Sequence, residues 1–224
     1  IICEDSIFTN CTSNGNGGAF DHYSSTSGTL KLLRTSFSHC KSGQYPSNGG
    51  CVYFVGLNST IDSCCVSYCA ASNQGHSFFV SLISPYNELT NENDTLFTLS
   101  KFIPFSKNQI HPNECHQSTI VYSSSPSEAK GSQSLYLSFG QIRISSLNST
   151  SNSVVSQAAS LMVHTMDSDA IIYHCTIERN IGPWIVYVYG RKGSAIEESN
   201  FIDNILNDDE KNGLVLYYKH TKIN

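Results

Sequence analysis

A recurring nine-residue phrase constrains the fold of this chain more than any other feature. A first residue, usually apolar, is followed by a small residue three positions later, an apolar residue two beyond that, and Cys or Asn three further on. The copies begin 29 residues apart at positions 3, 32 and 61, and 24 apart at 172 and 196. Such a period predicts a solenoid of stacked repeats. The five clear copies are Cys3, Ser6, Phe8, Cys11; Leu32, Thr35, Phe37, Cys40; Ile61, Cys64, Val66, Cys69; Ile172, Cys175, Ile177, Asn180; and Ile196, Ser199, Phe201, Asn204.

Each copy is accompanied by two further strand-like segments. One opens with a turn residue and continues with β-branched and aromatic residues, at 17–20, 49–55, 75–80, 118–122, 183–187 and 213–218. A shorter one leads back into the next copy, at 28–30, 59–61, 94–96, 169–171 and 194–196. Three strands per repeat predict an all-β fold, a right-handed parallel β-helix of about seven rungs that forms a single solenoid over residues 1–224.

The middle of the chain is less regular. Two copies are expected near residues 94–122 and 134–163, with polar loops near 85–93 and 123–134 leaving the rungs. The set Phe139, Ile142, Ile144 and Leu147 fits the offsets of the phrase with larger side chains.

Stacking explains the residue types of the phrase. In a parallel stack, equivalent residues of adjacent rungs lie about 4.8 Å apart, so like side chains form ladders. A column of small residues suits a bend where the backbone approaches the core. We expect three columns: an apolar ladder of Phe8, Phe37, Val66, Ile177 and Phe201; a small column of Ser6, Thr35, Cys64, Cys175 and Ser199; and an inward corner column of Cys11, Cys40, Cys69, Asn180 and Asn204.

A leucine-rich-repeat horseshoe is the alternative fold, because its repeat uses the same offsets of three, five and eight. That repeat has an apolar second position and a helical segment on its convex side. Here the second position is mostly Ser, Thr or Cys, and the remainder of each repeat is β-branched and aromatic. These features favour the β-helix.

Phe8-Thr9-Asn10-Cys11 with Gly17-Gly18-Ala19-Phe20, and Phe37-Ser38-His39-Cys40 with Gly49-Gly50-Cys51-Val52, carry a resemblance to a known family. The combination resembles the repeats of polymorphic outer-membrane proteins and of related large β-helical surface proteins in protists. The resemblance implies an adhesion-type surface protein without enzymatic activity.

Charge and hydropathy exclude two classes of partner. The net charge is −5 without a basic cluster, which argues against nucleic acid. No apolar run approaches 18 residues, so no membrane span is expected within this segment. The sequence begins at Ile1 without an initiator Met or signal core, and we expect a fragment of a longer cell-surface or secreted protein. Sequons for N-glycosylation stand at Asn10, Asn58, Asn93 and Asn148.

Of the nine cysteines, Cys11, Cys40 and Cys69 are interpreted as buried thiols. In a parallel ladder, neighbouring Cβ atoms lie about 4.8 Å apart, beyond the separation of about 3.5–4.5 Å that a disulfide needs. The alternative is a redox or disulfide set of Cys11, Cys40 and Cys69. Cys64 and Cys65 point to opposite faces of one strand, so Cys65 is expected to be exposed and reactive.

No catalytic, cofactor-binding or metal-binding residue is predicted. The acids do not align across rungs as a polysaccharide lyase or hydrolase requires, and 208–210 and 191–192 are interpreted as loops. The segment 111–116 resembles half of a zinc site without a second half. An exposed face for sugars is a further hypothesis, on Tyr45, Tyr86, Tyr122, Tyr187 and Tyr189.

The preferred function is therefore a non-catalytic adhesion or recognition scaffold for an unknown protein or glycan ligand. A carbohydrate-active enzyme on the same fold and a leucine-rich-repeat interaction module are the alternatives.

Overall fold

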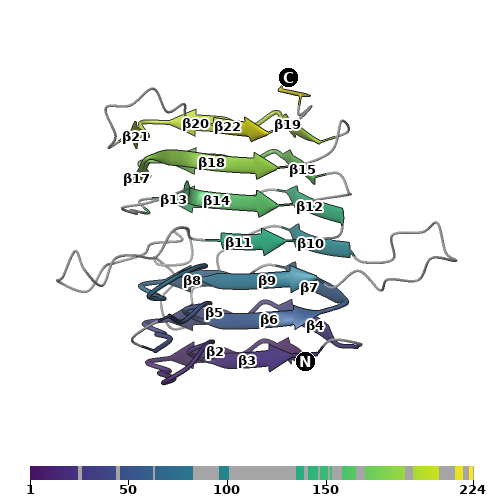
Figure 1. The fold of residues 1–224 in the computed structure, drawn as a ribbon, viewed down its shortest axis with the longest axis vertical. Helices are drawn as coiled ribbons and strands as arrows, with labels where there is room; N and C mark the ends of the chain where they lie inside the picture. Colours follow the sequence, from purple (N-terminus) through teal and green to yellow (C-terminus); the bar gives the residue numbers. More distant parts are fainter. Residues whose placement is uncertain are drawn as a thin grey trace, which may run out of the picture.

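The chain forms parallel strands stacked along one axis (Figure 1). Every strand pairing in the structure, a computed structural model, is parallel. The residues it describes contain no helix. These residues are 1–24, 27–43, 46–62, 64–82, 96–100, 135–138, 141–145, 147–150, 152, 158–164, 170–189, 194–206, 215–218 and 222–223. The fold is therefore the predicted all-β parallel β-helix. Its handedness stays a prediction.

Two long sheets form two sides of the solenoid. One sheet stacks eight strands in the order β1 (Ile2–Glu4), β4 (Thr29–Leu33), β7 (Asn58–Asp62), β10 (Leu96–Ser100), β12 (Gln141–Ser145), β15 (Ala170–Tyr173), β19 (Ala195–Glu197) and β23 (Lys222–Ile223). The other stacks seven: β3 (Phe20–Tyr23), β6 (Val52–Gly56), β9 (Phe78–Leu82), β11 (Leu135–Ser138), β14 (Ala158–His164), β18 (Trp184–Tyr189) and β22 (Val215–Tyr218).

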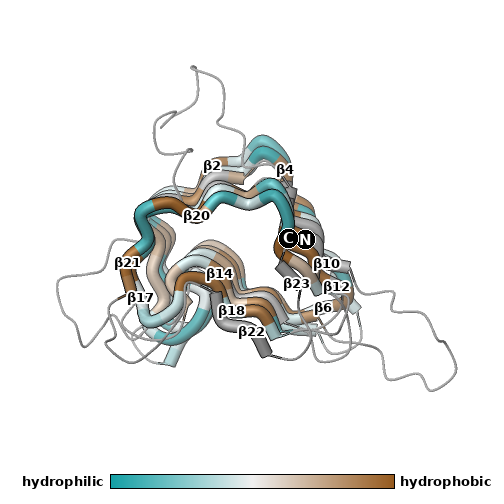
Figure 2. Tube along the Cα trace, turned by 90° about the horizontal axis from the view of Figure 1, so that it is seen from above, coloured by the Kyte–Doolittle hydropathy of each residue, from teal (hydrophilic) through white to brown (hydrophobic). Residues whose placement is uncertain are grey.

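Shorter sheets form the third side, and Figure 2 shows the sides surrounding the interior when the stack is viewed along its axis. These sheets are β2 (Ile7–Thr9), β5 (Ser36–Ser38) and β8 (Cys65–Ser67); β13 (Asn148–Thr150), β16 (Thr176–Glu178) and β20 (Asn200–Ile202); and the pair β17 (Ile181–Gly182) and β21 (Ile205–Leu206). A complete turn thus contains three strands on three sides, as β4, β5 and β6 do. A horseshoe has one strand per repeat, so the leucine-rich-repeat alternative is wrong.

The fourth turn differs from the prediction. The strand between β9 and β14 in the seven-stranded sheet is β11, whereas the sequence placed a strand of that turn at 118–122. Residues 83–95 and 101–134 lie outside the described part of the chain, and with them the predicted loops near 85–93 and 123–134. About five turns of the solenoid are regular, slightly fewer than the seven predicted, and the strands of the two long sheets continue into further, less complete turns.

The fifth turn is shifted relative to the expected phrase. Ile144 lies opposite Ile172, and Ser149 lies opposite Ile177. The copy in this turn is therefore Ile144, Leu147, Ser149 and Asn152, and not the set that begins at Phe139. Ser149 is buried at a position where the other clear copies carry an apolar residue, which is why the repeat escaped detection.

Apolar side chains of all three sides meet inside the stack. Phe37 and Phe54 are fully buried, and the Phe37 ring stacks on that of Phe8 with centroids 5.3 Å apart. The ring of Phe78 meets the edge of Phe37 at 5.6 Å. Aromatic contacts of this kind join adjacent turns across the core and hold the sides together.

Two corners use left-handed backbone at residues other than Gly in those turns where the structure describes them. The sharp bend leaves the following small side chain close to a carbonyl two residues back, to which Thr35, Cys175 and Ser199 donate at 3.0, 3.3 and 2.9 Å. The small column of the phrase therefore closes the first corner. The left-handed residues are Asp5, Arg34, His174 and Glu198 at that corner, and Asn10, His39, Tyr68, Arg179 and Asp203 at the second.

Candidate functional site

One outward column of the seven-stranded sheet is largely aromatic or apolar. Strand residues alternate between the core and solvent, so the residue after each buried Val52, Phe78, Leu161 or Val186 points outward. We call this column the outer ladder. Its described side chains are those of Asp21, Tyr53, Phe79, Met162 and Tyr187, and the backbone of the sheet stays in register through Tyr136 and Leu216. The side chains of Tyr53, Phe79, Met162 and Tyr187 are partly exposed.

The rings of the outer ladder pack against their neighbours. Tyr53 and Phe79 stack with centroids 5.0 Å apart and planes 18° from parallel. Tyr187 lies against Trp184, with centroids 5.9 Å apart. The Tyr53 and Phe79 rings therefore cover each other's facing surfaces and leave less of each face free for a ligand.

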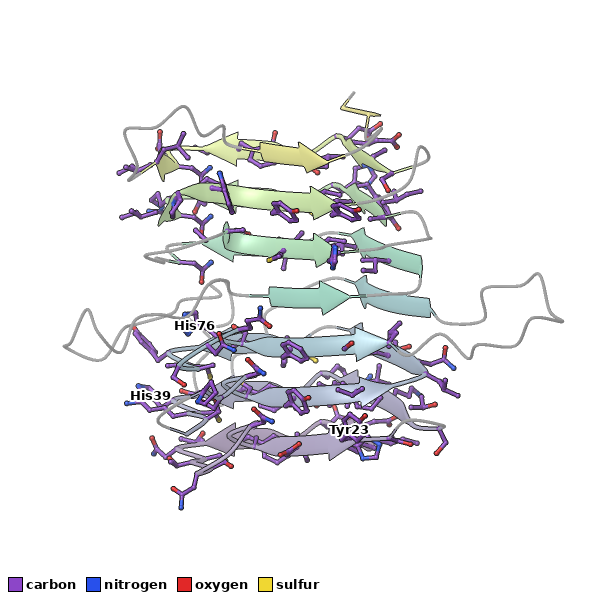
Figure 3. All side chains as sticks on the ribbon, viewed as in Figure 1. Tyr23, His39 and His76 are labelled. Carbon is purple, nitrogen blue, oxygen red and sulfur yellow. The ribbon has the colours of Figure 1, made fainter. Side chains whose placement is uncertain are left out.

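A second outward column runs beside the outer ladder. Tyr23, on the first strand of the sheet, is 68% exposed and is labelled in Figure 3. Further along the stack, His164 meets the edge of Tyr189, with ring centroids 4.6 Å apart. Ser81 lies between them in the same column. This column adds hydroxyl and imidazole groups beside the apolar outer ladder.

Burial shifts the pKa of three groups on this face in the direction that favours their neutral forms. It raises the pKa of the Tyr53 phenol, and the carboxylate of Asp21 adds to that shift. Burial also lowers the pKa of His164, which favours the neutral imidazole. The pKa of Asp21 is raised by burial too, against a smaller lowering by His22. Desolvation therefore disfavours the charged form of each of these three groups.

The structure describes only two of the five tyrosines that were predicted to bind sugars. Tyr187 and Tyr189 lie on the outward face of β18, whereas Tyr45, Tyr86 and Tyr122 lie outside the described residues. Sequence reasoning missed Tyr53, Phe79 and Met162. Their strands are apolar on both faces, so the alternation that would have marked outward positions is weak. Pairing these strands in register would have revealed the column.

The predicted apolar ladder comes together in two parts. Phe8, Phe37 and Val66 are paired in one stack, and Ile177 and Phe201 in another. Phe37, Val66 and Ile177 are buried, and Phe8 and Phe201 are partly exposed.

The corner column behaves as a hydrogen-bonded ladder in the later turns. Asn180 Oδ1 accepts from the Asn152 backbone N–H at 3.0 Å and from its Nδ2 at 2.8 Å. Asn180 Nδ2 donates to Asn204 Oδ1 at 3.1 Å and to the Ser149 carbonyl at 3.0 Å. Asn204 makes the equivalent contact to a backbone carbonyl of the turn below, with Nδ2 donating to the Ile177 carbonyl at 2.8 Å.

Cysteines take this corner column in the first three turns. Cys40 and Cys69 are fully buried and Cys11 is partly exposed. None of the seven cysteines whose side chains the structure describes forms a disulfide. Cys115 and the side chain of Cys65 lie outside that description. Sequence reasoning did not single out Cys51, whose sulfur lies with those of Cys40 and Cys69 within 4.8 Å of one another.

The sequons occupy different environments. Asn10 is exposed at a left-handed corner, and Asn58 is the partly exposed first residue of β7. Asn148 begins β13, without a described side chain, and Asn93 lies outside the described residues. The segments 111–116, 191–192 and 208–210 are also outside them.

Within the described residues, no helix is long and apolar enough to cross a membrane. No family model, curated protein or solved structure matches the chain.

Proposed function

We propose that this chain is a non-catalytic β-helix, displayed on a cell surface or secreted, that recognises a protein partner through the outer ladder. The observation that carries the proposal is that this column contains outward side chains on the five strands of the sheet where side chains are described, with the backbone in register through all seven strands. Six steps of about 4.8 Å give it a length of about 29 Å, which matches the span of a protein interface rather than of a small ligand.

The residue types of the outer ladder favour a protein as the partner. Tyr, Trp, Phe and Met are enriched at the cores of protein interfaces, where charged residues are depleted. Tyr53, Phe79, Met162 and Tyr187 supply these types, and the more polar groups Ser81 and His164 stand beside them. This is the arrangement of an apolar centre with a polar rim.

A glycan is the less favoured ligand for this face. Sugar rings bind to the open faces of aromatic side chains. The parallel stacking of Tyr53 on Phe79 at 5.0 Å leaves mainly ring edges and outer faces for contact. Ring edges and the Met162 thioether pack well against apolar side chains of another protein.

A non-catalytic role is supported by two acids on another side of the solenoid, because each is already paired with a basic side chain. The Asp5 carboxylate accepts two hydrogen bonds from the Arg34 guanidinium, at 2.7 and 2.8 Å. Glu198 pairs with His174 across adjacent turns. Such pairs tie turns together, whereas a glycosidase needs two acids that face a shared substrate.

Surface display is supported by the resemblance to β-helical surface proteins, and the exposed sequon at Asn10 is compatible with it. An exposed asparagine at a corner of the chain is a suitable acceptor for an N-linked glycan.

The test is binding of the fluorescently labelled chain to intact cells, with Tyr53→Ser and Met162→Ser as variants. Tyr173→Ser is the matched control, because Tyr173 is a partly exposed tyrosine on the eight-stranded sheet. We expect each outer-ladder variant to bind about tenfold more weakly or worse, since hot-spot truncations commonly exceed 1.4 kcal/mol. The control should bind as the unmodified chain does.

Treatment of the cells separates the two classes of ligand. Protease should abolish binding, and glycosidases should leave it unchanged. Equal binding by all variants, loss of binding after glycosidase treatment, or cleavage of a glycan by the purified chain would overturn the proposal.

A further inference from the structure

Three buried thiols from two adjacent turns converge inside the solenoid. Cys40 follows β5, Cys51 precedes β6 in the same turn, and Cys69 lies above Cys40 in the next turn. Their sulfur atoms all lie within 4.8 Å of one another, and each residue is fully buried. We call these residues the thiol cluster.

Packing of the solenoid explains only two of the three cysteines. Cys40 and Cys69 occupy the corner column, where Asn stands in the later turns. Cys51 belongs to a different column, in which its backbone is hydrogen-bonded to Ala19 below and Ser77 above at 2.9 Å. Ala and Ser satisfy that position in the neighbouring turns, so the fold does not require a thiol at Cys51.

The distances suit a single bound ion. Metal–sulfur bonds of about 2.3 Å place three thiolates around one ion about 3.8–4.0 Å apart. The sulfur atoms of the thiol cluster would need to move by less than about 1 Å to reach that spacing. Small changes in the side-chain torsions of Cys40, Cys51 and Cys69 supply such a movement without a shift of the strands.

The number of ligands restricts the choice of ion. Within the described residues, the group of possible metal ligands consists of the three thiols alone, without His, Asp or Glu. Cys11 is two turns from Cys69, about 9.6 Å along the ladder, so one ion does not reach both. Structural zinc sites almost always have four protein ligands. Three sulfur ligands are instead suited to a soft ion such as Cu(I).

The chemistry of the thiols is compatible with binding. Hydrogen bonds from Cys51 and then Cys69 lower the pKa of Cys40, and these outweigh the opposing effect of burial. Burial raises the pKa of Cys51 and Cys69. The Cys69 sulfur also accepts the backbone N–H of Cys40 at 3.4 Å. The thiolate is the metal-binding form of cysteine, so the positive ion promotes proton loss from the thiols that bind it.

We propose that Cys40, Cys51 and Cys69 form a three-thiolate site for a soft metal ion of the Cu(I) class. Each ligand thiol that ionises releases its proton to solvent, and copper keeps its oxidation state, so binding needs no oxidant or reductant. The site lies inside the solenoid and does not depend on the outer ladder.

The test is anaerobic titration of the reduced chain with Cu(I) in competition with a chromophoric Cu(I) chelator. We expect one ion per chain, with a shell of three sulfur atoms in X-ray absorption. Cys51→Ala should weaken binding by more than about a hundredfold, since even the loss of a group that only supports a ligand costs about 10–100-fold. Because Ala19 occupies the equivalent position, this variant should keep its fold.

Two further variants separate ligand loss from damage to the fold. Cys40→Asn places in the ladder the residue found at Asn180, and should abolish Cu(I) binding while preserving cooperative unfolding. Cys175→Ser is the matched control, because Ser199 occupies the equivalent position and Cys175 is outside the thiol cluster. It should bind Cu(I) as tightly as the unmodified chain.

The proposal is overturned if the unmodified chain binds Cu(I) no more tightly than Cys51→Ala. It is also overturned if the bound copper has a shell other than three sulfur atoms, or if Zn(II) binds and Cu(I) does not displace it. A disulfide between two residues of the thiol cluster in the chain purified without oxidant would likewise reject it.

Discussion

The thiol of Cys40 and the side-chain amide of Asn180 make the same contact in different turns. Cys40 Sγ lies 3.7 Å from the Phe8 carbonyl oxygen of the turn below, and Asn180 Nδ2 lies 3.0 Å from the equivalent carbonyl of Ser149. Both side chains donate to that oxygen. A cysteine therefore stands in for asparagine as a weaker donor at this corner.

The acceptor side of the corner column shows the same equivalence. The Cys69 sulfur accepts the backbone N–H of Cys40 at 3.4 Å, and Asn180 Oδ1 accepts the backbone N–H of Asn152 at 3.0 Å. Each of these side chains accepts a hydrogen bond from a backbone N–H at the second corner of the adjacent turn. The column thus depends on a small side chain that both donates and accepts, which explains the exchange of Asn and Cys.

Replacement of Asn180 by Ala should be costly, and replacement by Cys should be milder. Asn180→Ala leaves the buried Asn152 N–H and the Ser149 carbonyl without these partners. We expect a loss of about 3 kcal/mol in the free energy of unfolding. Asn180→Cys should lose about half as much, because a thiol restores both contacts at greater length. Urea unfolding of the two variants measures the difference, and equal losses would show that the thiol does not replace the amide.

Because His39 lies at the second left-handed corner, we expect the free energy of unfolding to depend strongly on the residue type at this position. This residue has φ = 55°, is exposed, and stacks on Tyr68 with ring centroids 4.9 Å apart. His39→Val should lower the free energy of unfolding by about 1–2 kcal/mol, because a β-branched side chain clashes with the backbone in this conformation. His39→Asn, the residue found at Asn10, should lose less than His39→Val. A Val variant as stable as the Asn variant in urea would contradict this account.

The sequence predicted the fold because its most informative residues face inward. The phrase from Leu32 to Cys40 covers residues on two sides of the core and at both corners, and stacking requires the same residue types in every turn. The prediction failed in a turn where a residue of another type occupies one of these positions. In the fifth turn, Ser149 takes the place of an apolar residue and hydrogen-bonds to the Ser160 hydroxyl at 2.6 Å. A polar pair that satisfies itself inside the core leaves no apolar signal.

The two candidate sites were harder to predict because each depends on contacts between different sides or turns. Cys51 joins the thiol cluster through the path of the chain between β5 and β6, which no local pattern shows. The outer ladder depends on the register of β6, β9, β14 and β18, whose buried and outward positions are both apolar. Periodicity within one strand does not distinguish them.

The apolar ladder should be most sensitive to substitution at its fully buried ring. Phe37→Ala removes a side chain that contacts Phe8, Phe20 and Phe78, and we expect a loss of about 3–5 kcal/mol in the free energy of unfolding. Phe8→Ala is the matched control in the adjacent turn, where the ring is partly exposed, and should lose less. Similar losses for the two variants would show that exposure in the first turn does not reduce the contribution of a ladder residue.

Acidification should destabilise the fold through His164. Burial lowers its pKa in the folded chain below the ordinary value of 6.5, so the unfolded chain binds a proton more readily. The stabilisation by neutral His164 is complete above about pH 6.5 and decreases as pH falls toward the folded-state pKa, since unfolding then takes up a proton. His164→Asn has no group that titrates in this range, and should lose less stability than the unmodified chain between about pH 7.5 and pH 5. Urea midpoints measured across this range give the two slopes, and parallel curves would show that His164 protonates equally in the folded and unfolded chain.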